Sequence, residues 1–202
     1  MGSLLVGVLQ GHAADLRYVG LLALASIPAA VVGISLKGAI SRVFDSPATA
    51  ATSLIVTGAV VYSTRWLLDR ARQPDPGWVG SLAVGLAQAT ALLPGISRSG
   101  VTVATALGFR TDRDAAAEFS FLLSVPAIFG AAILEIPAIF GSEFGISPAA
   151  LAAAAVGAFV TGMLAILLFV RWLRSGSFYR FAYYCWAVSG AYMLYALINL
   201  GR

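Results

Sequence analysis

The chain has 202 residues, of which 59% are hydrophobic and 11% are charged. Together with a mean hydropathy of +0.88, this composition exceeds the values of soluble domains and indicates an integral membrane protein. The net charge of +4 is spread over short segments that flank apolar stretches, which argues against a nucleic-acid-binding role. A single cysteine excludes an intramolecular disulfide.

About five apolar stretches are each close to the roughly 20 residues that a bilayer requires, and we expect them to be transmembrane helices. They are residues 18–36, 48–68, 115–136, 149–172 and 178–200. No strand-like alternation or soluble-domain linker separates them. The sequence therefore predicts one all-α polytopic membrane domain over residues 1–202.

A sixth apolar region, residues 78–109, is interrupted by Pro94 and Gly95. Proline removes a backbone donor and glycine permits unusual dihedral angles, so we expect two half-helices that form a re-entrant hairpin. Irregular backbone at membrane depth is tolerated only where it is buried in protein or lines a wet cavity. The break is therefore the place where we expect a site.

The segment after this break, residues 97–102 (SRSGVT), carries an arginine inside otherwise apolar sequence. A buried arginine costs roughly 2.5–3.5 kcal/mol on insertion scales, so it normally has a partner. A helix beginning near Ser97 would place unpaired N–H groups beside the planar fork of Arg98, which favours phosphate. Ser97 and Ser99 add hydroxyl donors, and Thr102 shares their helical face. The alternative is a polar hinge that caps a broken helix and pairs with a neighbour.

Two polar residues flank this predicted cradle. Gln88 lies six residues before Pro94 and would hydrogen-bond either a substrate or another helix. Glu118 lies near the start of an apolar span, where it would be a helix-start acid, a counter-ion to Arg98 or a catalytic group. His12, the only histidine, is more simply interpreted as an exposed loop residue than as a catalytic one.

Basic residues predict the orientation of the chain. Arg70 and Arg72 precede the hairpin, and Arg110 and Arg113 follow it. Because cytoplasmic loops are enriched in arginine and lysine, we expect this end of the hairpin to be cytoplasmic. The connection over residues 137–148 has an acid and no basic residue, and we expect it outside.

Residues 94–102 (PGISRSGVT) resemble the second signature of the undecaprenyl-diphosphate phosphatase family, the bacitracin-resistance membrane proteins. The resemblance continues through residues 113–126 (RDAAAEFSFLLSVP), places Gln88 where the family carries a glutamine, and extends loosely from about residue 21 to the C-terminus. It implies a fold in which two related hairpins form an inverted repeat, of which this chain shows one. It also implies a multi-pass protein of the cell inner membrane.

The activity that the resemblance implies is hydrolysis of a polyprenyl diphosphate to the monophosphate, in the recycling of a cell-wall lipid carrier. Arg98, Ser97, Ser99 and Thr102 would then be catalytic, while Gly95, Gln88 and Glu118 would bind substrate. A magnesium or calcium ion could bridge the phosphoryl oxygens, and no organic cofactor is expected. The expected partners are the polyprenyl diphosphate and membrane lipids. Whether the chain forms a homo-oligomer is left open.

The family's first signature, a Glu-x-x-x-Glu pair followed by Leu-Pro-x-Ser-Ser-x-Gly-His, does not occur in the sequence. Gly11 and His12 echo only its end, so no role is carried over to that histidine. We therefore expect a family member without the first two or so helical segments. Two alternatives to hydrolysis follow: a non-catalytic polyprenyl-phosphate binder or flippase, and a subunit whose site another chain completes.

Overall fold

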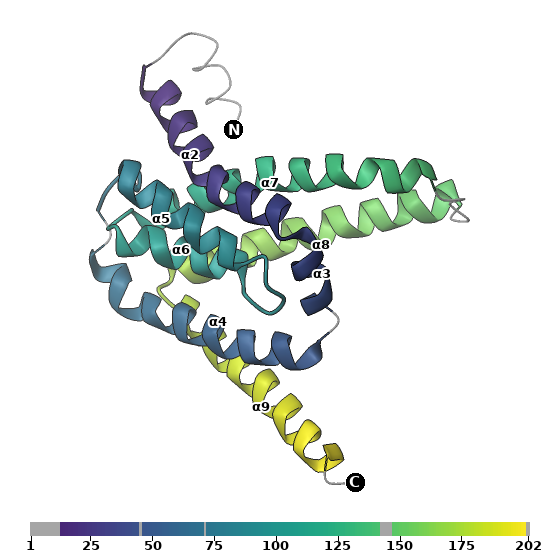
Figure 1. Cartoon of the computed structure of the whole chain (residues 1–202). Coiled ribbons are helices and arrows are strands. Elements are labelled where there is room, and N and C mark those ends of the chain that lie inside the picture. Colours follow the sequence, from purple (N-terminus) through teal and green to yellow (C-terminus); the bar gives the residue numbers. More distant parts are fainter. Residues whose placement is uncertain (1–12, 45, 71, 142–146, 201–202) are drawn as a thin grey trace.

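The computed structural model describes residues 13–44, 46–70, 72–141 and 147–200. They form helices α2 (Ala13–Ser35), α3 (Lys37–Phe44), α4 (Pro47–Leu67), α5 (Gly77–Thr90), α6 (Arg98–Gly108), α7 (Arg113–Gly141), α8 (Pro148–Arg174) and α9 (Phe181–Leu200), with 3-10 turns η1 (Leu68–Arg70) and η2 (Phe178–Arg180). Between these residues the only β pairing is an isolated bridge between Gln73 and Thr111. The predicted all-α class is confirmed (Figure 1). His12 and Glu143 lie outside the described residues.

Serine residues define where several helices begin. The Ser46 hydroxyl accepts a hydrogen bond from the Thr49 amide at 3.3 Å and caps α4. The Ser147 hydroxyl likewise accepts from the Ala150 amide at 3.2 Å and caps α8. Each serine is followed by a proline, whose fixed φ suits the first helical position and whose missing N–H would have had no intrahelical partner. Local sequence thus sets the start of both helices.

Four described stretches are long and apolar enough to cross a membrane: Ala13–Ser35, Arg113–Ile133, Ala149–Arg174 and Phe178–Asn199. If α3 and α4 are counted together as one bent span, they make a fifth candidate. α4 coincides with the predicted span over residues 48–68, but its serines and threonines make it less apolar than the others. With these spans the chain is a multi-pass membrane protein, as predicted.

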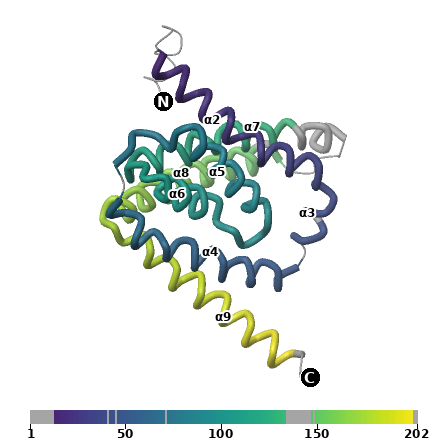
Figure 2. Tube along the Cα trace, turned by 60° about the vertical axis from the view of Figure 1, so that its left-hand side comes forward, coloured from purple at the N-terminus to yellow at the C-terminus, as the bar shows by residue number. Residues whose placement is uncertain are grey.

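α6 lies at the centre of the fold. It packs against α4, α5 and α7, and the pair α5 and α6 lies between α2 and α4 in both views (Figures 1 and 2). Most of α6 is buried, including Val103 and Leu107, and these side chains belong to one core with Phe119 and Leu123 of α7. The predicted hairpin is present, since α5 ends at Thr90 and α6 begins at Arg98.

The periphery of the molecule is apolar and uncovered. α7 and α8 extend side by side away from the centre (Figure 1), and none of the most apolar stretch of α8 is buried inside the protein. α9 packs along α4 and is joined to it by two hydrogen bonds. Trp186 Nε1 of α9 donates to the Ile55 carbonyl of α4 at 3.2 Å, and Ser189 Oγ of α9 donates to the Ala51 carbonyl of α4 at 2.7 Å. Because hydrocarbon is the solvent of a spanning helix, exposed leucine and phenylalanine side chains here need no protein partner.

Candidate functional site

The site is organised around the loop of residues 91–97, which turns the chain from α5 into α6 (Figure 2). Gly95 has φ +89°, a left-handed conformation that glycine adopts without steric cost. A Cβ atom at this position would collide with the Ala50 carbonyl oxygen of α4. Glycine is therefore required twice, for the turn itself and for the close approach of the loop to α4.

Thr57 of α4 fixes this loop, and sequence reasoning missed it. Its Oγ1 donates to the Gly95 carbonyl at 2.8 Å and accepts from the Ser97 amide at 3.0 Å. The side chain is 1% exposed, so both bonds form away from water, where unpaired polar groups are costly. The sequence did contain a signal that could have indicated Thr57. Ser53, Thr57 and Thr64 put polar groups on one face of an apolar helix, and in the structure all three are buried.

Arg98 is the first residue of α6 and is half-buried. Its Nε donates to Gln88 Oε1 of α5 at 3.1 Å, and one terminal nitrogen donates to the Leu123 carbonyl of α7 at 3.1 Å. A guanidinium has five N–H donors, so these two bonds leave three. The arginine is thus held between three helices and retains donors for an oxyanion.

Gln88 supports Arg98 with its oxygen and leaves its nitrogen unpaired. The residue is 3% exposed, and Nε2 has no hydrogen-bond partner within the described structure. An unsatisfied buried donor costs about 1–3 kcal/mol, and such a cost is understandable where a ligand supplies the acceptor. Of the two partners expected for Gln88, a substrate or another helix, the structure shows the second, because Oε1 accepts from Arg98 of α6.

The start of α6 adds backbone donors to this group. The Ser97 hydroxyl accepts from the Gly100 amide at 3.2 Å and caps the helix. The amides of Arg98 and Ser99 occupy the first turn, where no intrahelical acceptor exists, and the helix dipole is positive there. The hydroxyl of Ser99 makes no hydrogen bond to any described residue and is partly exposed. These groups and the Arg98 guanidinium form a set of donors suited to phosphate.

Thr102 and Glu118 lie apart from this set of donors. Thr102 Oγ1 bonds the Arg98 carbonyl at 2.8 Å and lies 2.6 Å from Ser120 Oγ of α7, and Thr102 is 1% exposed. Its hydroxyl therefore joins α6 to α7. Glu118 is exposed on α7, and no ion pair between it and Arg98 occurs in the described part of the chain.

The described residues include no group of three histidine, cysteine, aspartate or glutamate side chains that could hold a metal ion. The polar groups that the described residues bring together here are arginine, amide and hydroxyl donors. The fold and the site together define a class: a multi-pass helical membrane protein with a half-buried arginine at the break of a helical hairpin.

Comparison with known proteins identifies the family within this class. The family model described as "Bacitracin resistance protein BacA" matches residues 3–191, and the chain belongs to this family. The "Undecaprenyl-diphosphatase" of Desulforapulum autotrophicum is 38% identical over 175 residues, covering 86% of this chain and 63% of the relative. The protein of the same name from Desulfatibacillum aliphaticivorans is 38% identical over 183 residues, covering 90% and 66%.

A third relative is similar to this chain over nearly all of its own length. The "Undecaprenyl-diphosphatase" of Methanothermobacter thermautotrophicus is 36% identical over 177 residues, covering 86% of this chain and 97% of the relative. The chain thus spans just under two thirds of the first two relatives and almost all of the third. The resemblance recognised in residues 94–102 is confirmed at the level of the family.

Proposed function

We propose that this chain hydrolyses a polyprenyl diphosphate to the monophosphate and inorganic phosphate, as a step in recycling a cell-wall lipid carrier. The names of the similar proteins support this activity. The observation that carries it is the half-buried Arg98, anchored by Gln88 and Leu123 and left with donors at the start of α6.

In this reaction water attacks the terminal phosphorus, the bond from that phosphorus to the bridging oxygen breaks, and the monophosphate leaves. Charge is distributed over the phosphoryl oxygens in the transition state, so catalysis depends on positioned donors. The remaining Arg98 donors, the Ser99 hydroxyl and the first amides of α6 would neutralise that charge. The Ser97 O–H can also donate while its oxygen caps the helix.

The other predicted residues support these contacts. Gly95 brings the loop against α4, and Gln88 would offer its unpaired Nε2 to a phosphoryl oxygen while Oε1 holds Arg98. Thr102 would act as a positioning residue, because its hydroxyl joins α6 to Ser120 of α7. Glu118 lies apart from these donors, and its exposed carboxylate would contact the substrate outside the phosphate group.

A magnesium or calcium ion is part of the proposal as a component of the substrate. A diphosphate carries adjacent anionic oxygens that chelate such ions, and the described acidic residues form no cluster that would hold one beforehand. We expect phosphate release to fall when a chelator removes the ion. Release that is unchanged by the chelator would contradict this part of the proposal.

The proposed activity is tested by measuring phosphate release from a polyprenyl diphosphate by the purified chain in detergent. We expect Arg98→Ala to lower kcat/KM by roughly 10²–10³-fold, the usual effect of removing a charge-stabilising donor. Arg98→Lys keeps the charge without the planar fork and should recover only part of the activity. Arg171→Ala, which removes an exposed arginine of α8, is the matched control.

The outcome separates hydrolysis from binding or transport without hydrolysis. Release that Arg98→Ala lowers and Arg171→Ala does not supports hydrolysis at the α6 site. Retained lipid binding without release would contradict hydrolysis and favour a polyprenyl-phosphate binder or flippase, which transport of labelled lipid in liposomes would then distinguish. Release that survives Arg98→Ala would contradict the assigned site.

A further inference from the structure

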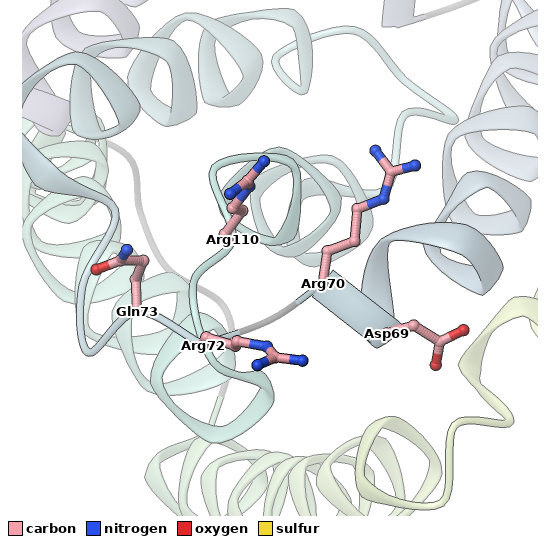
Figure 3. Close-up of a pocket in the computed structure, with 5 residues that line it drawn as sticks. All are labelled: Asp69, Arg70, Arg72, Gln73 and Arg110. Carbon is pink, nitrogen blue, oxygen red and sulfur yellow. The ribbon is translucent and has the colours of Figure 1, made fainter.

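A second basic site lies at the other end of the hairpin from Arg98. A cavity of about 340 Å³ is lined by Asp69, Arg70, Arg72, Gln73 and Arg110, where η1 ends and α6 has just ended (Figure 3). α6 runs from Arg98 to Gly108, which at 1.5 Å per residue puts about 15 Å of helix between the two ends. The cavity is therefore separate from the proposed catalytic site.

Backbone hydrogen bonds join two of the segments that line this cavity. The amides of Arg72 and Gln73 both donate to the Arg110 carbonyl, at 2.7 and 2.8 Å, and the Asp112 amide donates to the Gln73 carbonyl at 2.7 Å. These bonds tie the segment after η1 to the segment after α6. Arg72 and Arg110 are consequently presented from two backbone segments that are held together, which lowers the entropy lost on binding.

Arg110 occupies a conformation that disfavours its side chain. Its φ is +62°, in the left-handed region where a residue with a Cβ pays roughly 1–2 kcal/mol and where glycine or asparagine is usual. Strain of this kind tends to occur at functional positions. An arginine here keeps a guanidinium beside the cavity at a local cost to the backbone.

The charge of the cavity is not neutralised. None of its three arginines makes an ion pair with any described residue, whereas Arg17 pairs with Asp75 at 2.9 Å and Arg174 with Asp114 at 2.7 Å. Asp69 lines the same cavity, but Figure 3 shows its carboxylate directed away from the Arg110 guanidinium. Three cations and one anion leave an excess of positive charge, which favours an oxyanion that guanidinium groups can bind.

Two tryptophans place this end of the hairpin at the membrane surface. Trp66 in the last turn of α4 is 58% exposed, and Trp78 in the first turn of α5 is 54% exposed. Exposed tryptophan is enriched at the level of the lipid headgroups, and basic pockets between spanning helices bind anionic headgroups there. The ligand chemistry is thus a phosphate ester at headgroup depth.

We infer that Arg70, Arg72 and Arg110 form a binding site for the phosphate headgroup of an anionic phospholipid. The inference does not depend on the proposed hydrolysis, because it concerns the opposite end of α6. The site would anchor the base of the hairpin to the membrane surface while the Arg98 end faces the substrate. Inorganic phosphate shares the same chemistry, so the experiment includes it as a competitor.

The test is lipid retention by the full chain in detergent, measured by native mass spectrometry with phosphatidylglycerol or phosphatidylcholine. We expect the wild-type chain to retain more phosphatidylglycerol than phosphatidylcholine. The double variant Arg70→Gln/Arg72→Gln should retain roughly 5–30-fold less phosphatidylglycerol than the wild type. The matched control is Arg42→Gln with Arg171→Gln, which removes two exposed arginines outside the cavity and should stay within about twofold of wild type.

Three results would overturn the inference: equal loss of retention in both double variants, equal retention of the two lipids by the wild type, or displacement of phosphatidylglycerol by millimolar inorganic phosphate. The wild-type comparison needs no substitution, so it decides the question even if the double variant misfolds. A single variant, Arg110→Asn, suits the left-handed conformation and should by itself reduce retention of phosphatidylglycerol several-fold.

Discussion

The two ends of α6, which we propose bind different anions, present their donors in different ways. At the start of the helix, one half-buried arginine is held by Gln88 and the Leu123 carbonyl. Beyond the other end, three exposed arginines line a cavity without ion pairs among the described residues. The first arrangement fixes the direction of a few donors, whereas the second concentrates charge. Catalysis needs fixed direction, and recruitment of a lipid headgroup needs charge.

The loop before α6 holds the donors of the proposed catalytic site in fixed positions. Gly95 contacts α4, Thr57 bonds the loop at two points, and Arg98 bridges α5 and α7. A preorganised donor stabilises developing charge without reorganising during the reaction. Disturbing the loop should therefore affect hydrolysis far more than lipid retention at the arginine cavity.

Among substitutions that act through the loop and its supports, the largest effect is expected from Gly95→Ala. The new Cβ would meet the Ala50 carbonyl oxygen in a left-handed backbone conformation, so the loop must move, and a displacement near 1 Å can cost about 10²-fold in rate. Phosphate release should fall by about that factor. Gly162→Ala in α8, where nothing lies within 4 Å of a new Cβ, is the matched control, and equal losses in both variants would contradict the role of the loop.

Thr57→Val should have the next largest effect. Valine is nearly isosteric but cannot donate to the Gly95 carbonyl or accept from the Ser97 amide, so both groups lose a buried partner. We expect kcat to fall roughly 10–30-fold while phosphatidylglycerol retention is unchanged. Thr57→Ser should restore most of kcat. Thr161→Val is the control, because that hydroxyl bonds only carbonyls of its own helix.

Gln88→Leu tests whether Arg98 must be held from the side of α5. Loss of the Oε1 acceptor at 3.1 Å leaves Arg98 Nε without its partner, and loss of Nε2 removes a donor to substrate. We expect KM to rise roughly tenfold, in line with one or two charge-assisted hydrogen bonds. Gln88→Glu should also raise KM, since a carboxylate would compete with phosphate for Arg98. An unchanged KM in both variants would contradict this role.

The smallest effect should come from Thr102→Val, which removes the contact with Ser120 of α7. A buried hydrogen bond contributes about 1 kcal/mol to stability, so the melting temperature should fall by a few degrees and kcat only about 2–3-fold. Thr102→Ser should recover both quantities. A loss of activity as large as that of Arg98→Ala would instead indicate direct contact between Thr102 and substrate.

The positions of the spanning helices and the hairpin were predictable because they follow from runs of apolar residues and from helix breakers. The break at Pro94 and Gly95 and the cap at Ser97 are local features, and the structure has both. The family was predictable from residues 94–102 for a similar reason, since a short signature is a local feature of the sequence.

What could not be predicted depends on contacts between distant segments. Thr57 meets Gly95 from 38 positions away, and Arg98 meets the Leu123 carbonyl from 25 positions away. The shared face of Ser53, Thr57 and Thr64 singles out the threonine, but periodicity does not give its partner, because a threonine in an apolar helix commonly bonds its own backbone. The arginine cavity was missed for the same reason: Arg70, Arg72 and Arg110 looked like separate orientation signals until the backbone bonds to Arg110 joined them.

The central claim is that the substrate diphosphate lies at the Arg98 end of α6, and cysteine protection tests it most directly. Because Cys185 is the only cysteine and is buried, Ser99→Cys and Arg72→Cys can each be placed in a Cys185→Ala background and labelled with a soluble maleimide. We predict that polyprenyl diphosphate slows labelling at position 99 and leaves labelling at position 72 unchanged. Protection at position 72 alone, or at neither position while the lipid stays bound, would contradict the account.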